Sequence, residues 1–367
     1  MKIIETDNYA AHYRSAIYML MDKELGCDFC FGDYLDGNIK KLDYSLLTHK
    51  VQEVRNVKLG LGFSWQQGIL SLLGKDYDRL IFIGEPRCLS TWAALIRGRF
   101  HRKKKTYVWT HGWYGKETWY ERIIKKVFLR LPTGGVFLYG NYARELMIKE
   151  GFNPQRLFVI HNSLDYDRQL EIRQKLSVKP IYKNHFKNDY PNLFFVGRLT
   201  EVKRLNMILQ AMSVLRDKGK FYNLTFIGDG VKTQELKQLS SELGLQKNVW
   251  FYGACYDEQV LGEMIYNADL CVAPGNIGLT AMHTLVFGTP AITHGDFPHQ
   301  MPEFEAIREG ETGSFFKIGS VESLADGISQ WFGAQGYNRE RIRQDCMKEI
   351  DSYWTPQYQI EILKKHL

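Results

Sequence analysis

Short apolar runs alternate with longer segments of helical periodicity through the second half of the chain. The runs that read as buried strands are 192–199, 223–230, 248–254, 270–275 and 289–293. Between them, apolar residues recur every three or four positions over 201–219, 233–245, 257–268 and 278–288. Strands that alternate with helices of 10 to 15 residues indicate βαβ units and a parallel sheet with helices on both faces.

The first half follows a looser version of the same pattern. Strands are predicted at 79–86, 105–113, 134–140 and 156–163, with helices between them. We therefore predict an α/β protein of two Rossmann-like domains with parallel sheets, at 1–165 and 192–352. The polar, Lys-rich stretch 166–191 is expected to be a linker. The last segment, 353–367, is expected to be a terminal helix that can pack back on the first domain, with Thr355 as N-cap and Pro356 in its first turn.

Composition supports a folded, cytoplasmic protein. The 367 residues are 44% hydrophobic and 14% aromatic, which is ample for packed cores. No run approaches the roughly 18 apolar residues that span a bilayer, and the first residues lack the apolar core of a secretory signal. Cys27 and Cys30 form a C-x-x-C, but no second pair completes a zinc site, so buried thiols are expected.

Positive charge is concentrated in the first half. Residues 1–165 hold 25 Lys and Arg against 17 Asp and Glu, whereas 166–367 hold 23 against 24. The densest basic piece is 97–105, and the segment 117–131 combines an apolar stripe with basic residues. One interpretation is an interfacial helix on anionic lipid. The other, which periodicity alone favours, is a domain helix with a core stripe and a solvated basic face. A nucleic-acid partner is not expected, because no recognition motif accompanies the charge.

Glycines stand where the predicted strands of the second half end. They are Gly197, Gly228, Gly253 and Gly275, whereas Gly288 precedes its strand and is typical of a helix C-cap. Ligands of open parallel sheets bind outside the carboxyl ends of the strands. The loop "PGNIGLTAMH" opens a helix there but carries no Lys, Arg or carboxylate. Arg198 and Lys203, in "VGRLTEVKR" about 80 residues earlier, supply two cations suited to a diphosphate.

With these motifs on one sheet, the sequence resembles glycosyltransferase family 4, the "group 1" glycosyltransferases of GT-B fold. The resemblance is strongest over 192–316 and includes "YGNYARELMIKEGFNPQRLFVIHNSLD", where Ser163 replaces the usual glycine. It implies that Arg198 and Lys203 bind the diphosphate of a nucleotide-sugar. It also implies that the donor meets Gly197 and the backbone N–H groups that follow the later loop, those of Gly278, Leu279 and Thr280.

The sequence departs from the family at a paired-glutamate motif. The family has two glutamates separated by seven residues, one for the sugar and one for the ribose, and here the positions hold Gly275 and His283. His283 can still hydrogen-bond a ribose hydroxyl. Asn276 is one candidate for the lost sugar contact. The other is a nearby carboxylate, if these do not simply form a solvated loop: Asp296, Glu303 or Glu305.

The first domain offers further candidates. In "WTHGW", His111 stands at a strand end, where resembling enzymes have a histidine that touches the donor sugar. Candidates for the acceptor are His12, Tyr13, Arg14 and, at another strand end, Glu85. Asp-x-Asp occurs at 76–78 and 165–167, but the first pair lies just before a strand and the second overlaps the "NSLD" turn, so both are interpreted as incidental. No metal is expected.

The sequence thus predicts a retaining glycosyltransferase that works in the cleft between the two domains. Its catalytic residues would be His111, Arg198 and Lys203. It would use a nucleotide-sugar as co-substrate, without another cofactor, and a glycan or lipid-linked acceptor in surface polysaccharide synthesis. The resemblance leaves two rivals, a non-catalytic nucleotide-sugar-binding subunit and a GT-B-type epimerase. An NAD dehydrogenase is disfavoured, because no G-x-G-x-x-G follows a first strand.

Overall fold

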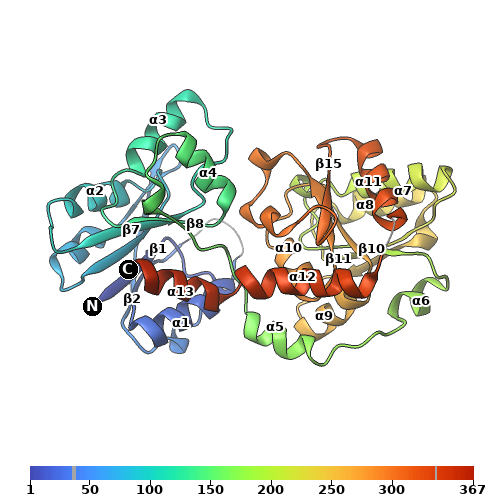
Figure 1. Ribbon diagram of the computed structural model, residues 1–367, viewed down its shortest axis with the longest axis horizontal. Helices are drawn as coiled ribbons and strands as arrows, with labels where there is room; N and C mark the ends of the chain where they lie inside the picture. Colours follow the sequence, from blue (N-terminus) through green and yellow to red (C-terminus); the bar gives the residue numbers. More distant parts are fainter. Residues whose placement is uncertain (35–38, 335–336) are drawn as a thin grey trace. The chain divides into compact units, whose positions relative to one another are not determined.

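A computed structural model describes residues 1–34, 39–334 and 337–367. The chain divides into two compact units (Figure 1). Unit 1 comprises Met1–Tyr166 and Trp354–Leu367, and unit 2 comprises Asp167–Tyr353. Both are α/β units built on a parallel sheet, as the alternating pattern predicts. In the described part of the chain, no helix is long and apolar enough to cross a membrane.

Unit 1 is built on a seven-stranded parallel sheet in the order β3-β2-β1-β6-β7-β8-β9. Its strands are β1 (Ile3–Asp7), β2 (Asp28–Gly32), β3 (Val51–Val54), β6 (Arg79–Ile83), β7 (Lys105–Thr110), β8 (Gly135–Leu138) and β9 (Leu157–Val159). Its helices are α1 (Ser15–Leu25), α2 (Leu89–Gly98), α3 (Trp119–Phe128), α4 (Asn141–Lys149) and α13 (Pro356–His366). A separate antiparallel hairpin, β4 (Asn56–Gly60) with β5 (Phe63–Gln66), was not predicted.

The side chains of successive strand residues in unit 1 pack in two different cores, because they alternate between the faces of the sheet. In β6, Leu80 and Phe82 pack in the core beneath α2, α3 and α4, whereas Ile81 packs in the core beneath α1 and α13. Figure 1 shows these two helix groups on opposite sides of the sheet. The terminal helix α13 therefore belongs to unit 1, with Thr355 accepting the N–H of Tyr358 as its N-cap. Cys27 and Cys30 are buried free thiols.

Unit 2 is built on a six-stranded parallel sheet in the order β12-β11-β10-β13-β14-β15. Its strands are β10 (Asn192–Val196), β11 (Asn223–Ile227), β12 (Val249–Gly253), β13 (Leu270–Ala273), β14 (Ala291–His294) and β15 (Gly313–Phe316). Its helices are α5 (Tyr166–Arg173), α6 (Ile181–Phe186), α7 (Asn206–Asp217), α8 (Thr233–Glu242), α9 (Glu258–Asn267), α10 (Thr280–Val286), α11 (Val321–Gly333) and α12 (Arg339–Tyr353). In Figure 1, α7, α8 and α11 lie on one side of this sheet and α9, α10 and α12 on the other.

Two parts of unit 2 differ from the sequence-based prediction. The stretch 166–191, expected to be a linker, contains α5 and α6 and belongs to unit 2 from Asp167 onwards. Tyr182 of α6 explains why, because it is buried and donates its hydroxyl to the carbonyl of Met264. The helix predicted from residue 201 starts only at Asn206. A 3-10 turn, η5 (Glu201–Lys203), and Arg204 with a φ of 50° come before it.

Candidate functional site

The two loops that carry the predicted donor residues leave neighbouring strands of unit 2. Strands β10 and β13 are paired and parallel, with Leu193 opposite Leu270. The chain leaves β10 toward β11 on one side of the sheet and leaves β13 toward β14 on the other. This is the topological switch point of an open α/β sheet, where ligands bind outside the carboxyl ends of the strands. The loop bearing Arg198 and Lys203 and the loop bearing residues 275–280 therefore meet at one edge.

Close backbone approaches fix the β10 loop. A Cβ added to Gly228, after β11, would lie 1.9 Å from the carbonyl oxygen of Gly197. Gly197 itself has a φ of 139°, which a side chain would strain. On the other side, the hydroxyl of Thr280, the first residue of α10, donates to the carbonyl of Val196 at 3.1 Å. The glycines predicted to lie at the strand ends thus let three loops pack together.

Lys203 is tied to the β13 loop. Its Nζ donates to the backbone oxygen of Asn276 at 2.8 Å and to the Oδ1 of Asn276 at 3.0 Å. The N–H of Gly275 donates back to the carbonyl of Lys203 at 3.0 Å. Burial lowers the pKa of Lys203, and the carboxylate of Glu303 acts in the opposite direction. The sequence therefore brings this lysine to the start of the α10 loop, as the resemblance implied, but its ammonium group is held by Asn276.

Backbone atoms crowd Gly275, one of the two positions where the resemblance implied a glutamate. A Cβ at this position would lie 2.1 Å from the carbonyl oxygen of Val202 and 2.7 Å from the Cα of Lys203. Both of these atoms belong to backbone, which cannot rotate away as the end of a side chain can. No side chain, and so no glutamate, fits at residue 275 while η5 keeps this position.

Arg198 and Arg204 flank Lys203, and both are exposed. Within the described residues, no hydrogen bond or ion pair engages the guanidinium of Arg198. Arg204, which the motif contains but the sequence analysis did not select, acts electrostatically on His294 at the end of β14. An exposed arginine can form two parallel hydrogen bonds with a phosphate. The edge therefore presents up to three cations beside the loop that leads into α10.

The other donor-site candidates occupy different environments. Gly278 has a φ of 52° and opens the turn into α10, followed by Leu279 and Thr280. His283 is half-buried, and its Nδ1 is closed off from solvent without a hydrogen-bond partner. Among the alternative carboxylates, Glu303 is 2% exposed and close enough to act on Lys203, whereas Asp296 pairs with His299 at 2.9 Å. Glu305 is half-buried.

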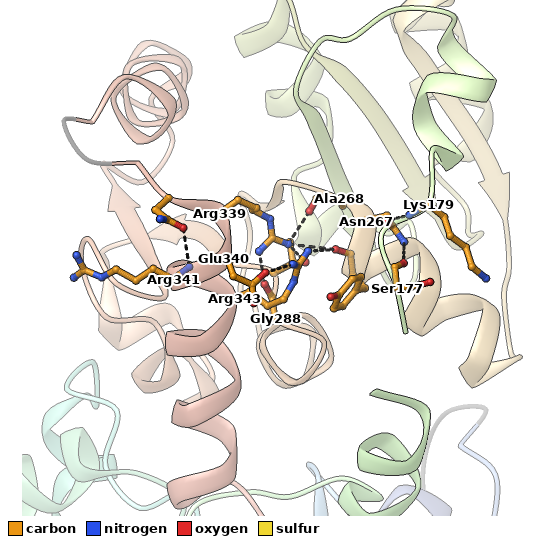
Figure 2. A network of polar contacts seen from close by, with 12 residues as sticks. Ser177, Lys179, Asn267, Ala268, Gly288, Arg339, Glu340, Arg341 and Arg343 are labelled. Carbon is orange, nitrogen blue, oxygen red and sulfur yellow. Dashed lines mark hydrogen bonds and ion pairs between the residues drawn. The ribbon is translucent and has the colours of Figure 1, made fainter. Parts of the chain in front are cut away.

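An arginine network holds the far ends of α9 and α10 (Figure 2). Arg339 of α12 donates to the carbonyl of Gly288, just past α10, at 2.6 Å, and to that of Ala268, just past α9, at 2.9 Å. Arg343 donates to the carbonyl of Tyr266 at 3.2 Å. Helix carboxyl termini leave carbonyls without partners, and these arginines satisfy them. The C-cap of α10 is Phe287, and Gly288, predicted as the C-cap, is the next residue, where its φ of 77° turns the chain out of the helix. The network fixes two helices whose opposite ends face the site.

Unit 1 has its own switch point, between β1 and β6. The loop after β1 carries the acceptor candidates His12, Tyr13 and Arg14, and the loop after β6 carries Glu85. His12 and Glu85 are exposed, and Tyr13 is half-buried. Arg14 instead turns inward, where it forms an ion pair with Asp7. The fold therefore gathers all four candidates at one edge of the sheet, although the guanidinium of Arg14 is already paired with Asp7.

A buried polar cluster beside this loop escaped the sequence analysis. Glu5 is 2% exposed, and Asp7 accepts a hydrogen bond from Tyr18 at 3.0 Å. The guanidinium of Arg14 also lies over the ring of Trp109, 4.7 Å from its centroid. His111, at the end of β7, packs against the ring of Tyr139, and burial lowers its pKa to about 4. Its imidazole is therefore neutral at physiological pH. The pattern of apolar and polar positions does not indicate that ionisable residues of β1 are buried, so only the fold shows this cluster.

Glu5 makes the stability of the protein depend on pH. Burial, followed by repulsion from Asp7, raises its pKa from an ordinary 4.5 to about 8. The protonated form is thus favoured in the folded state. Stability from this group is complete below the unfolded pKa and is lost as pH rises toward 8. Each pKa unit corresponds to about 1.4 kcal/mol, so the loss of stability amounts to several kcal/mol.

Glu5→Gln should flatten the decline in the free energy of unfolding between pH 5 and 8, as measured by urea unfolding. Glu145→Gln, at an exposed position, should leave it unchanged, and equal slopes for all three proteins would contradict the assignment.

In the described part of the chain, no three His, Cys, Asp or Glu side chains gather in a group that could hold a metal ion. Asp76 and Asp78 precede β6, and both bind Lys2: Asp76 accepts from its Nζ at 2.6 Å and Asp78 from its backbone N–H at 2.8 Å. Ser163, in the turn where the family has glycine, donates to Gln359 of α13 at 2.5 Å.

The surface of α3 tests the interpretation of the basic segment as a helix with a core stripe. Its apolar stripe is not in the core: exposed fractions are 76% for Trp119, 50% for Tyr120, 55% for Ile123, 45% for Ile124 and 51% for Val127. Only Phe128 of the helix is buried. Periodicity alone favoured a core stripe, and that interpretation is wrong for these exposed side chains, whereas Phe128 does pack in the core. It failed because periodicity locates an apolar face without saying what covers it.

Comparisons with known proteins agree with this fold. The family model described as "Glycosyl transferases group 1" matches residues 180–346. "Putative glycosyltransferase EpsD" of Bacillus subtilis is 29% identical over 153 residues, 41% of this chain and 38% of that protein. An "Uncharacterized 41.2 kDa protein in cps region" of Klebsiella pneumoniae is 25% identical over 258 residues, 70% of this chain and 62% of that protein. The chain thus spans less than two thirds of these curated relatives.

Solved structures extend the likeness to the whole chain. The apo form of the lipopolysaccharide outer core galactosyltransferase WaaB has a TM-score of 0.73 at 16% identity, covering 100% of both chains. Anabaena HepE in complex with UDP has a TM-score of 0.72 at 16% identity, covering 100% of this chain and 99% of that one. At such identity the likeness shows the fold. Residues 180–346 are therefore similar to the group 1 glycosyltransferases, and the whole chain has the GT-B fold.

Proposed function

We propose that this protein transfers a sugar from a nucleotide-sugar to a hydroxyl group of a glycan or lipid-linked acceptor, in the synthesis of a surface polysaccharide. The observation that carries the proposal is the edge of unit 2 where Arg198 and Lys203, after β10, meet the loop into α10, after β13. Support comes from the family match and from HepE, a neighbour of the same fold whose structures contain UDP and UDP-glucose.

The proposed chemistry needs stabilisation of a leaving diphosphate. As the bond between the anomeric carbon and the phosphate oxygen breaks, negative charge grows on that oxygen. In this proposal Arg198, Lys203 and the N–H groups of Gly278, Leu279 and Thr280 stabilise it, which is the electrostatic part of catalysis. The acceptor oxygen bonds to the anomeric carbon from the face that the phosphate leaves, so that configuration is retained, and its proton passes to the leaving phosphate. Gly197 lies against the donor, and the neutral imidazole of His111 is proposed to contact the donor sugar.

The test is product formation by the purified chain with UDP-sugars and an acceptor, with and without excess EDTA. We expect an acceptor-dependent glycoside whose yield survives EDTA, because cationic side chains do the work of a metal. A donor that is isomerised without an acceptor would establish an epimerase instead. Binding without any turnover would establish a non-catalytic subunit. Loss of turnover in EDTA, restored by magnesium or manganese, would contradict metal independence.

We further propose that unit 1 docks on an anionic lipid bilayer, on the inner face of the cytoplasmic membrane. Five large apolar side chains of α3 are exposed, as given above, and Phe100 beyond α2 is 81% exposed. The segment around Phe100 adjoins α3, since Arg99 donates to the carbonyl of Leu131 at 3.2 Å. The same two segments of the chain also carry exposed cations: Arg97, Arg99, Arg102, Lys103, Lys116 and Arg122. An apolar helix face bordered by Lys and Arg matches the interface of an anionic membrane.

Co-sedimentation with vesicles distinguishes this docking from non-specific adsorption. Trp119→Ser with Ile123→Ser should reduce binding to phosphatidylglycerol vesicles by at least tenfold, because each side chain contributes roughly 1–2 kcal/mol when buried in the interface. Val231→Ser, which changes an 86% exposed side chain of unit 2, should have no effect. Binding that ignores the variants, or is equal on uncharged phosphatidylcholine, would contradict the proposal.

A further inference from the structure

A cavity opens at the amino edge of the unit 2 sheet, at the opposite ends of the strands from Arg198 and Lys203. Its volume is about 290 Å³, near the lower limit of roughly 300 Å³ that is typical of ligand pockets. Asn192, the first residue of β10, and Asp269, which directly precedes β13, both line it. The five residues of β10 extend over roughly 16 Å, so the cavity is separate from the diphosphate edge.

Asp269 is held in place with one carboxylate oxygen uncommitted. Its Oδ2 accepts hydrogen bonds from the backbone N–H of Asn192 at 2.8 Å and from the Nδ2 of Asn192 at 3.3 Å. Within the described residues, no hydrogen bond engages its Oδ1 or the hydroxyl of Tyr337, and neither atom is closed off from solvent. Burial raises the pKa of Tyr337 to about 12, and the nearby carboxylate of Asp269 acts in the same direction. The cavity therefore offers a fixed acceptor beside a phenol hydroxyl.

Aromatic rings supply the apolar part of the lining. Phe332 of α11 and Tyr337 both line the cavity, with their ring centroids 5.8 Å apart. Tyr190 also lines it and stacks on Phe221, with centroids 5.4 Å apart and an interplanar angle of 22°. Tyr190 is 39% exposed and Phe221 is 46% exposed. Core packing does not account for a stacked pair that stays this open to water.

The charges around the cavity disfavour an anionic ligand. Lys183 and Asp189 line it but pair with each other at 2.8 Å. Asp269 is balanced by Arg339 and Arg343, which donate to backbone carbonyls in the network of Figure 2. A phosphate group would therefore meet the carboxylate of Asp269 without an unpaired cation among the described lining residues. A neutral ligand with several hydroxyl groups meets no such repulsion.

We propose that this cavity binds one sugar unit of a neutral glycan, at a site separate from the reaction. Sugar hydroxyls donate to the Oδ1 of Asp269 and exchange hydrogen bonds with the hydroxyl of Tyr337, while a C–H face of the sugar ring packs on Tyr190. A second point of attachment keeps a glycan close to the enzyme between transfers, because it raises the effective concentration of the chain. The inference goes beyond the proposed function, since the sugar bound here does not react.

The test measures binding of the methyl glycosides of glucose, galactose, mannose and N-acetylglucosamine by saturation-transfer NMR, with saturating UDP present. At least one glycoside should bind. Tyr190→Ala should weaken its binding about fivefold, because the ring face is lost. Tyr337→Phe keeps the ring against Phe332 and loses only the hydroxyl, so it should weaken binding about threefold. Tyr256→Ala, which removes a 94% exposed tyrosine elsewhere in unit 2, should bind as the wild type does.

The outcomes separate this site from the donor edge. If no glycoside binds, or if Tyr190→Ala and Tyr337→Phe both bind as the wild type does, the inference is overturned. Binding that UDP or inorganic phosphate abolishes also overturns it, because the sugar then occupies another site. Tyr337→Phe remains decisive if the Tyr190→Ala protein does not fold. A chain that binds a glycoside with this dependence on Tyr190 and Tyr337, but binds no nucleotide, overturns the proposed function and supports the inference.

Discussion

Lys203→Ala is expected to weaken nucleoside-diphosphate binding by about 1.5–3 kcal/mol, roughly 10- to 100-fold, and Arg198→Ala by a similar amount. These are the magnitudes of hydrogen bonds to charged groups. Lys203 is half-buried and has its ammonium next to Asn276, so its contribution should depend little on salt. Arg198 is exposed, and its contribution should shrink at high ionic strength.

Calorimetric titration with UDP at two salt concentrations measures both effects. Lys247→Ala, an exposed lysine of the same unit, is the matched control and should bind as the wild type does. Because Lys203 also ties η5 to the β13 loop, the unfolding temperature of each variant has to be measured as well. If both variants are folded and bind with unchanged affinity, the diphosphate does not bind at this edge of the sheet.

Gly275→Glu is expected to damage the site rather than restore the family's glutamate. Any Cβ at residue 275 would overlap the carbonyl oxygen of Val202, 2.1 Å away, so η5 has to move. Lys203 is the last residue of η5 and would move with it. We expect a loss of stability on the order of 2–4 kcal/mol, as for other overpacked sites. Nucleoside-diphosphate affinity should fall as well.

Gly275→Ala separates sterics from chemistry. It adds only the Cβ and should reproduce most of both losses. Gly253→Ala is a useful comparison, since a Cβ there meets nothing within 4 Å and only its φ of 93° opposes the change. A Gly275→Glu protein that is stable and more active than the wild type would show that the loop adapts, and that this account of the missing glutamate is wrong.

The sequence predicted the fold of unit 2 well because apolar strands and helices alternate there without interruption. The glycines at the strand ends correctly predicted the edge of the sheet at which Arg198 and Lys203 lie. The start of α7 was predicted several residues early, since a 3-10 turn and Arg204 in a left-handed conformation interrupt a continuous helical pattern. Propensity cannot reveal such a turn when tertiary contacts impose it.

Other features depend on contacts between residues far apart in the chain. From the sequence, Gly275 stands where the resemblance implies a glutamate. Only the structure shows that the carbonyl oxygen of Val202 excludes a side chain at this position. The exposed face of α3 has the periodicity of a core helix, and nothing in one sequence tells whether another element covers it.

Hydrogen–deuterium exchange with and without UDP tests the central claim most directly, because it locates the nucleotide without any mutation. We predict slower exchange in peptides that cover 197–204 and 274–283, which hold the diphosphate loops and α10. Peptides of the hairpin formed by β4 and β5 should exchange at the same rate in both samples. If UDP binds but these two segments of unit 2 exchange unchanged while protection appears elsewhere, the nucleotide site lies outside the β10–β13 switch point and the account is contradicted.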